Sequence, residues 1–414
     1  MIWALLGFLP FVTEAWHLDA SIISWALWPG HAKGMLMALL DSVAIGSLMA
    51  LPAQRVKTPF TILIIAYIAA ATLSIVFAQV KLASFFFAWE LARMLLLFIA
   101  VSRIATQPRG TDFIIYGLAA AMILQAVVAI NQRLHGVAQT SGLMEHQNSL
   151  GMAMHFGMFP CIALLLAGRR DRLILLGAIS GMICVVLTGS RATIGLAGSG
   201  MVILAILSLM RRPTGRKAGI VAAGALALLV AAPVAYVGLT QRVTTDSFSG
   251  SDSERTALIR AAWMIIGDHP MGIGANEYVI TANVDGYSAR AGVEWGGGSR
   301  AAHVHNAYLL NTAELGYLGG GVFIALMVIP VFTVFRFAWS RRTDTRGELA
   351  LGLAVGLAMA AAHGLFEWIY VSQPILYLHA IGLGLAAGLI RQRRLEARQG
   401  RVAPPARRLV EVTA

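Results

Sequence analysis

The sequence predicts an all-α integral membrane protein with about twelve transmembrane helices and one large loop outside the membrane. Hydrophobic residues make up 58% of the 414 residues and charged residues only 13%, and the mean hydropathy is +0.73. Soluble domains contain roughly 25% charged residues. Apolar runs close to the length of about 20 residues that a bilayer requires recur along the chain. Residues 240–304 form the one long polar interruption.

The apolar runs define four regions. Residues 1–239 hold nine expected helices, residues 240–304 the large loop, residues 305–390 three more helices, and residues 391–414 a basic tail. The first run is poorly bounded, because acidic and histidine side chains interrupt it. The expected spans are 1–28, 35–53, 59–78, 82–103, 112–131, 149–167, 172–189, 191–210, 218–239, 305–335, 347–371 and 374–390.

Basic residues in the short connections predict the orientation. Lys and Arg collect on cytoplasmic loops, and here they fall on alternate connections, with seven more arginines after Ile390. Both termini are therefore expected in the cytoplasm, with loops 132–148 and 240–304 on the other side. The net charge of +12 then reflects topology and contact with anionic lipid in the phospholipid bilayer, not a nucleic-acid partner.

The large loop is expected to contain an amphipathic helix over SDSERTALIRAAWMIIGDHP. Ser251 and Glu254 have the spacing of a capping box, and Gly267 and Pro270 indicate the end of the helix. Helical spacing of apolar residues predicts a stripe that faces the membrane-embedded body. The stripe consists of Leu258, Ile259, Ala262, Trp263 and Ile266.

Two arginines of this helix are candidates for binding a substrate. Arg255 lies one turn before the stripe and is expected to point the same way, towards the body. Arg260 is expected on a different face.

His305 opens the run HNAYLLNTAELGYLGG, where the polar loop meets a membrane helix. An imidazole titrates near neutrality and can take a proton from a sugar hydroxyl. The alternative is a histidine that only hydrogen-bonds at the helix start. On one continuous helix, His305, Gly316 and Gly319 share a face, with Gly320 a turn beyond Gly316, so the glycines would let a helix or a lipid lie close beneath the imidazole.

Arg191 lies in TGSRATIGLAGSG, between two apolar runs with almost no linker. This position predicts that the Arg191 guanidinium lies at the outer face of the membrane that contains the protein. The planar guanidinium can pair with two phosphate oxygens and stays charged, which favours an anion-binding role. The alternative is an anchor whose charged end reaches the interface.

Three further polar residues near the same face are candidates. Glu314 lies within an apolar run, where it either pairs with an arginine or takes part in chemistry. Asn148 either contacts a substrate head group or caps a helix. His303 is expected to support the site from the loop. Glu90 and Arg93 are expected to pair with each other, and no role follows for Asp41, His363 or Glu367.

His305–Asn306, nine residues and then Gly316-x-x-Gly319 together resemble the H-N-x9-G-x-x-G signature of the O-antigen ligase family. That superfamily also includes O-antigen polymerases and some bacterial O-oligosaccharyltransferases. The resemblance extends to the TGSR junction and to the S-x-R…W…DHPMGIG loop, and it covers the chain from about residue 140 to 380.

The resemblance implies a GT-C-like, inverting glycosyltransferase of the bacterial inner membrane that needs no metal or other cofactor and has its active site on the periplasmic face. The donor would be a glycan on undecaprenyl diphosphate. The acceptor would be a sugar hydroxyl of lipid A–core, or a growing glycan in a polymerase. Carried over by position, the catalytic residues would be His305, Arg191 and Arg255, with Arg260 as the alternative for the role of the loop arginine. The substrate-binding residues would be Arg260, Asn306, Glu314, Gly316, Gly319, Asn148 and His303.

Two other functions compete with the ligase. Polymerases of this superfamily tend to have two sizeable outer loops with several arginines, whereas loop 132–148 is short and contains only Arg133, which favours the ligase. A secondary transporter is favoured by the intramembrane groups Glu90, Arg93, Glu314 and Glu367. The large outer loop and the lack of an internal repeat argue against a transporter.

Overall fold

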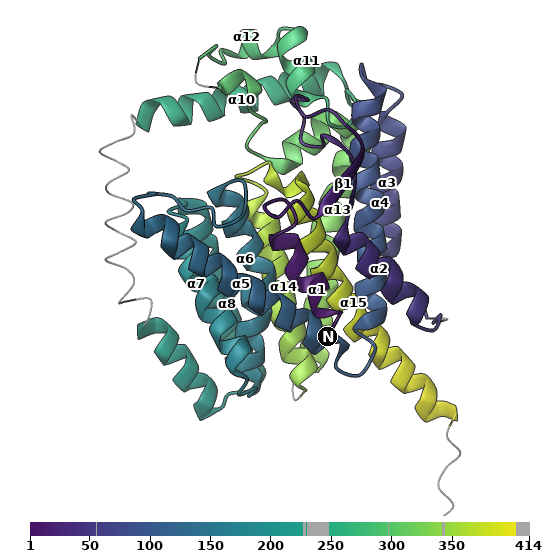
Figure 1. The fold of residues 1–414 in the computed structure, drawn as a ribbon, viewed down its shortest axis with the longest axis vertical. Helices are drawn as coiled ribbons and strands as arrows, with labels where there is room; N and C mark the ends of the chain where they lie inside the picture. The colour runs from purple at the N-terminus through teal and green to yellow at the C-terminus, as the bar shows by residue number, and fades with distance from the viewer. Residues whose placement is uncertain (55, 227–228, 230–247, 297, 342–343, 403–414) are drawn as a thin grey trace, which may run out of the picture.

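The computed structural model describes residues 1–54, 56–226, 229, 248–296, 298–341 and 344–402, and its architecture is mostly helical (Figure 1). Within these residues seven helices are long and apolar enough to cross a membrane, so the chain is a multi-pass membrane protein. Three shorter apolar helices accompany them: α2 (Leu39–Ala50), α3 (Thr61–Ser74) and α7 (Arg172–Leu187). The seven long helices are α4 (Lys81–Ile104), α5 (Gly110–Leu134), α6 (Gln147–Ala167), α8 (Arg191–Arg211), α13 (Ala307–Ser340), α14 (Thr345–His363) and α15 (Gln373–Val402).

The N-terminal region differs from the prediction of a first span over residues 1–28. It contains the short helix α1 (Ala4–Phe8), the 3-10 turn η1 (Leu9–Phe11) and the strand β1 (Asp19–Ser24). This strand pairs antiparallel with β2 (Gly34–Ala38). The fold is therefore not entirely α-helical, and the expected span 35–53 begins as a strand. Polar residues after η1 and the turn sequence WPGHAKG reverse the chain before a spanning helix can form.

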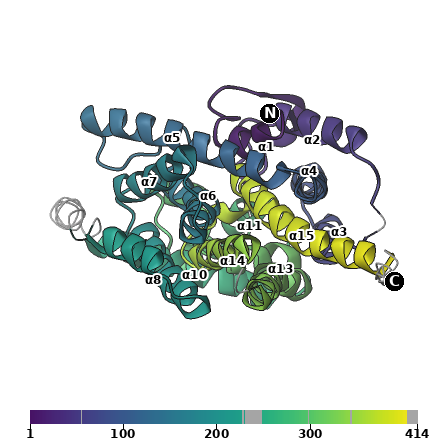
Figure 2. The same cartoon turned by 90° about the horizontal axis from the view of Figure 1, so that it is seen from below.

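The interior of the bundle is built around α15. Its apolar part is buried along the whole of its length, whereas α8 and α13 expose most of theirs on the outside of the bundle. Figure 2 shows α15 running between α4 on one side and α13 and α14 on the other. The helix continues past the expected end at residue 390 to Val402. Arg391, the first residue of the predicted tail, is buried and donates to Ser102 Oγ at 3.0 Å and to Gln54 Oε1 at 2.7 Å. The first part of the predicted tail is thus helical, and residues 403–414 lie outside the described residues.

Side-chain caps define where several helices begin. A polar side chain before the first turn accepts a hydrogen bond from a backbone N–H that has no partner within the helix. His146, Asp171 and Asp344 do so for α6, α7 and α14. Ser190 of the TGSR junction caps α8, and Asn306 caps α13. The polar junctions noted in the sequence therefore act first as helix starts.

The long helix α13 is broken at Gly316, which has φ 71° and ψ −179°. The loop after α10 inserts its backbone at this break. Ile273 N donates to Ala313 O at 3.1 Å, and Tyr317 N donates to Pro270 O at 3.1 Å. A Cβ on Gly316 would lie 2.5 Å from the carbonyl carbon of Met271, so only glycine fits here. The expectation that residue 305 and the glycines share one face of a continuous helix is therefore wrong.

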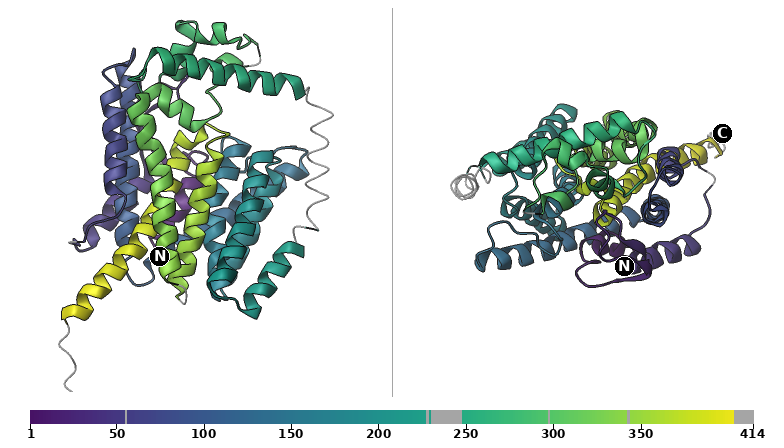
Figure 3. Two further views of the ribbon diagram at one scale, coloured as in Figure 1. Left: turned by 180° about the vertical axis from the view of Figure 1, so that it is seen from behind. Right: turned by 90° about the horizontal axis from the view of Figure 1, so that it is seen from above.

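Three helices of the large loop lie together at one end of the bundle (Figures 1 and 3). They are α10 (Phe248–Asp268), α11 (Tyr278–Val284) and α12 (Tyr287–Ala291), followed by the 3-10 turn η2 (Ser299–Ala301). The start of the chain and the end of α15 lie towards the opposite end (Figure 1). Residues 215–226 are helical, and the rest of the expected span 218–239 falls largely outside the described residues.

The predicted loop helix is confirmed, with two corrections. It begins at Phe248, so residue 251 lies inside the helix and is not its N-cap. Ile259 and Trp263 are 37% and 57% exposed, so they do not belong to the buried stripe. The buried face follows the 3.6-residue period more closely and consists of Ala257, Leu258, Ala261, Ala262, Ile265 and Ile266.

Candidate functional site

The carboxylate of Glu367 brings three of the predicted site residues together. Its Oε2 atom lies 3.1 Å from His305 Nδ1. Its Oε1 atom accepts hydrogen bonds from Asn148 Nδ2 at 2.6 Å and from the Arg255 guanidinium at 3.3 Å. Residues more than 200 positions apart in the sequence therefore meet at one acidic group.

Four separate segments supply this cluster. Glu367 lies in the turn between α14 and the 3-10 turn η3 (Ile369–Val371). Asn148 is the second residue of α6, and His305 immediately precedes the N-cap of α13. Arg255 comes from α10, on the side that faces the bundle, as the sequence predicted. Each side chain is thus fixed at a helix end or on a packed helix face.

The exposure of the side chains divides the cluster into a buried support and an accessible edge. The Glu367 side chain is 4% exposed, whereas those of His305 and Arg255 are 28% and 43% exposed. A substrate can therefore reach the imidazole and the guanidinium, while the carboxylate that holds both is shielded from water.

This arrangement suits His305 for proton transfer. A carboxylate partner at Nδ1 favours the tautomer that carries its proton there, which leaves a lone pair on Nε2. The same carboxylate stabilises the imidazolium that forms when Nε2 takes a proton. A histidine with this partner can act as a general base for a hydroxyl group.

Arg191 is the first residue of α8, and its side chain is exposed. The start of α8 packs against the start of α6, since a Cβ on Gly151 would overlap the side chain of Thr193. Gly151 lies one helical turn, about 5 Å, from Asn148, which contacts Glu367. Arg191 is thus at the same end of the bundle as the Glu367 cluster and beside the helix that contributes to it.

Arg260 lies apart from this cluster. Its guanidinium donates to Ala291 O, at the end of α12, with a distance of 3.3 Å. It lines a hollow of about 470 Å³ between α10 and α12, together with Thr256 and Gly292. The two loop arginines therefore face different surroundings, and Arg255 is the one beside His305.

His303 and Glu314 belong to a second, buried cluster. Glu314 pairs with His31 Nε2 at 3.2 Å and accepts a hydrogen bond from Tyr278 N, so its partner is not the arginine that the sequence suggested. The His303 ring stacks on Trp368 with 4.3 Å between centroids. Burial lowers the pKa of His303 well below its usual value, so this imidazole is neutral.

The residues of the glycine signature hold the backbone in place. Asn306 caps α13 through Oδ1, which accepts from Tyr308 N and Leu309 N at 2.9 and 3.0 Å. Gly316 forms the break described above. A Cβ on Gly319 would overlap Leu315, and a Cβ on Gly320 would overlap Thr312, so both glycines allow the broken helix to fold back tightly.

Sequence reasoning missed the role of Glu367. It also paired Glu90 with Arg93, whereas Arg93 forms its ion pair with Asp41 at 2.7 Å. His363, which had no assigned role, lies beside His155, with 3.3 Å between His363 Nδ1 and His155 Nε2. A carboxylate within the expected span 347–371 was the one available signal for Glu367, but the sequence offered no way to select its partners.

A comparison with known families matches residues 174–324 to the O-antigen ligase family, so this part of the chain is similar to the domain that defines that family. Proteins with this domain are membrane enzymes that transfer glycans, and they include both ligases and polymerases. The matched range contains Arg191, Arg255 and His305, whereas Asn148 and Glu367 lie outside it. A comparison with curated proteins found no match.

Proposed function

We propose that this chain, whose residues 174–324 match the O-antigen ligase family, transfers a glycan from undecaprenyl diphosphate to a sugar hydroxyl of lipid A–core. The observation that carries the proposal is the contact of His305 Nδ1 with the buried carboxylate of Glu367, which Arg255 shares. This contact supports the proposed roles of His305 as a base and of Arg255 as a phosphate-binding group, and both residues lie within the matched range.

We place the protein in the bacterial inner membrane with α10–α12 in the periplasm. The opposite end of the bundle carries Arg169 and Arg216, and also Arg109, Arg211 and Lys217, next to the helix ends. Clusters of this kind mark the cytoplasmic side. Both termini would then be cytoplasmic, and the Glu367 cluster would open to the compartment where lipid-linked glycans are joined.

In the proposed reaction, the acceptor hydroxyl attacks the anomeric carbon of the donor from the face opposite the diphosphate. The hydroxyl proton moves to His305 Nε2 while the bond between the anomeric carbon and the phosphate oxygen breaks. Undecaprenyl diphosphate departs with the electron pair of that bond, and the glycan is joined with inverted configuration. Glu367 balances the positive charge that the imidazole gains.

The departing diphosphate gains negative charge, and the arginines are suited to stabilise it. Arg255 uses one guanidinium nitrogen for Glu367, and its 43% exposure leaves other N–H groups accessible to phosphate oxygens. Arg191 adds a second guanidinium at the start of α8. Because the donor is already activated, the proposed mechanism requires no metal ion.

The ligase is preferred to a polymerase because one outer connection is short. The segment between α5 and α6 covers residues 135–146, and Arg133 in the last turn of α5 donates to Ala138 O at 3.0 Å. It therefore offers little surface for a second glycan chain. A strain that lacks a ligase accumulates long lipid-linked chains, whereas a strain that lacks a polymerase makes single capped repeats.

The direct test is transfer in vitro from a lipid diphosphate glycan to purified rough lipopolysaccharide, with and without a chelator. We expect His305→Ala and Arg191→Ala to abolish transfer at unchanged protein level and membrane insertion. His135→Ala and Arg133→Ala are matched controls at the same end of the bundle and should stay active. Near wild-type transfer by either test variant would disprove the role of that residue, and loss of activity in chelator would disprove the metal-free mechanism.

A further inference from the structure

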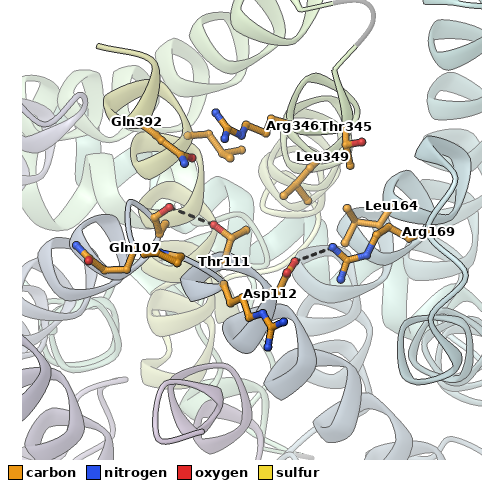
Figure 4. A pocket seen from close by; sticks show the side chains of 13 residues that line it. Gln107, Thr111, Asp112, Leu164, Arg169, Thr345, Arg346, Leu349 and Gln392 are labelled. Atoms are coloured by element: carbon orange, nitrogen blue, oxygen red, sulfur yellow. Dashed lines mark hydrogen bonds and ion pairs between the residues drawn. The ribbon is translucent and has the colours of Figure 1, made fainter. Parts of the chain in front are cut away.

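A cavity lies at the end of the bundle opposite the Glu367 cluster and takes no part in the proposed reaction. It has a volume of about 310 Å³ and is shown in Figure 4. The turn between α4 and α5, the end of α6, the start of α14 and the side of α15 surround it. Ligand sites commonly have volumes of about 300–1,000 Å³, so the cavity is large enough for a polar head group.

Three arginines line this cavity, each from a different segment: Arg109, Arg169 and Arg346. Asp112 is the one acidic residue of the lining, so the lining carries a formal charge of about +2 (three arginines less one aspartate). Lining amides and hydroxyls from Gln107, Thr111, Thr345 and Gln392 add neutral hydrogen-bonding groups. The net positive charge and the hydrogen-bonding groups of this lining favour the binding of an anion.

The arginines retain capacity for a ligand. Arg346 pairs with Glu396 at 2.6 Å, but both side chains are more than a third exposed, so solvent weakens this pair. Arg169 pairs with Asp112 at 3.0 Å on one side of the cavity (Figure 4). Arg109 makes none of the ion pairs found in the described part of the chain.

The backbone fixes Arg109 at the edge of the cavity. This residue has φ 59°, in the left-handed region that non-glycine residues rarely adopt. The next residue, Gly110, lies so close to Ile104 that any Cβ there would overlap the Ile104 carbonyl. The turn between α4 and α5 is therefore closely packed, and its backbone fixes the point from which the Arg109 side chain extends.

The remaining wall of the cavity is apolar. Leu164 and Leu349 lie beside the charged groups (Figure 4), and Leu389 also lines the cavity. A second hollow of about 340 Å³ continues from it past Phe113 and Tyr116, and it shares Arg109 and Arg169. An anion that also carries hydrocarbon fits such a lining better than a free anion does.

We propose that this cavity binds the head group of an anionic phospholipid, with the phosphate between Arg109 and Arg346 and the acyl chains along the leucine wall. Basic pockets between transmembrane helices at the cytoplasmic interface are suited to this task. The site would tie the α4–α5 turn to the start of α14, the helix that ends just before Glu367. The proposal does not depend on the transfer reaction, because lipid binding is measured without it.

The test uses the full chain in nanodiscs of phosphatidylcholine that contain a small fraction of phosphatidylglycerol, with retained lipid counted by native mass spectrometry. Arg109→Gln should lower retention of phosphatidylglycerol about fivefold, and Arg109→Gln with Arg346→Gln about 25-fold, at roughly one factor of five per arginine. Arg170→Gln is the matched control, since this exposed arginine is on the same loop as Arg169 but outside the lining.

The outcomes separate the proposal from its alternatives. Equal loss in Arg170→Gln would show a diffuse effect of surface charge and overturn the cavity site. Unchanged retention in the double variant would overturn it as well. Release of the lipid by millimolar inorganic phosphate would identify a free-anion site in place of a lipid site. Gel filtration and thermal unfolding of each variant establish that it is folded. Neither Arg109 nor Arg346 is buried, so both should be replaceable without loss of the fold.

Discussion

Replacing Glu367 by Gln tests the central contact of the site. The substitution keeps the size of the side chain and its ability to accept from Asn148, but it removes the negative charge 3.1 Å from His305 Nδ1. If His305 takes the acceptor proton, the transition state places a positive charge beside this position. The variant should therefore bind donor and acceptor but turn them over slowly.

The size of the effect follows from the charges. Two unit charges about 4 Å apart interact by about 4 kcal/mol at an effective dielectric constant of about 20. Arg255 already neutralises part of the carboxylate, and the half-exposed edge admits water, so we take about 2–3 kcal/mol as the loss in the transition state. This corresponds to a decrease in kcat of roughly 30- to 160-fold.

The assay is transfer to rough lipopolysaccharide under saturating and limiting donor, so that kcat and KM are separated. Asp268→Asn is the matched control, because Asp268 is an exposed acidic residue at the end of α10, the helix that carries Arg255, and it accepts from Tyr287 Oη at 2.9 Å. A merely structural role for Glu367 would lower the amount of folded protein and leave kcat per folded molecule unchanged. Transfer by Glu367→Gln within twofold of wild type would refute the reasoning.

Three further predictions follow from the structure. Arg255→Gln should lower kcat/KM for the donor at least tenfold, because Arg255 contacts Glu367. Arg260→Gln should lower it less than threefold, because Arg260 contacts Ala291 O away from the cluster. The reverse order of the two effects in transfer assays would exchange the roles of the two arginines. Gly316→Ala should lower Tm by several degrees, since a positive φ with ψ near 180° costs a non-glycine residue about 1–3 kcal/mol before the overlap with Met271 is counted. Gly321→Ala, where a Cβ meets nothing, should not lower Tm. Burial, followed by the charge of Glu314, raises the pKa of Glu277 to about 7, so the folded chain holds a proton there that the unfolded chain releases near pH 4.5. This contribution to stability is full below pH 4.5 and is lost as the pH rises through about 7. The Tm of Glu277→Gln should therefore rise relative to the Tm of the wild type between pH 5 and pH 8. A Tm difference between the two proteins that does not change with pH would contradict the assignment.

Local patterns predicted much of the fold, because apolar runs and caps act within one segment. The runs that became α4, α5, α6, α7, α8 and α13 were located to within about five residues, and so was α10 of the loop. The expected span 347–371 starts near the beginning of α14 but extends eight residues past its end at His363. The N-terminal hairpin was missed since its apolar residues suit a membrane span as well as they suit strands. Only pairing between residues 19–24 and 34–38 distinguishes the two.

The site was predicted in part, and the limit has a physical cause. Residue type and position identified His305 and the face of α10 that carries Arg255, because a polar group at a membrane boundary is a local feature. The partner of both, Glu367, comes from a different helix pair, and no spacing rule links it to residue 305. The intramembrane charges that favoured a transporter have tertiary partners too: Asp41 for Arg93 and His31 for Glu314.

The spacing between Asn306 and Gly316 in the glycine signature sets the length of the first segment of α13. Between the cap at Asn306 and the break at Gly316, ten helical positions span about 15 Å. His305 lies at one end of this segment. At the other end, two backbone hydrogen bonds hold the loop after α10: Ile273 N donates to Ala313 O, and Tyr317 N donates to Pro270 O.

That loop leaves the end of α10, so the same hydrogen bonds also position Arg255 over the turn that contains Glu367. A residue inserted between positions 306 and 316 would move the docking point by about 1.5 Å and rotate it by about 100°. The guanidinium and the imidazole would then no longer share one carboxylate. The fixed spacing in the signature thus sets the geometry between two side chains that lie 50 positions apart in the sequence.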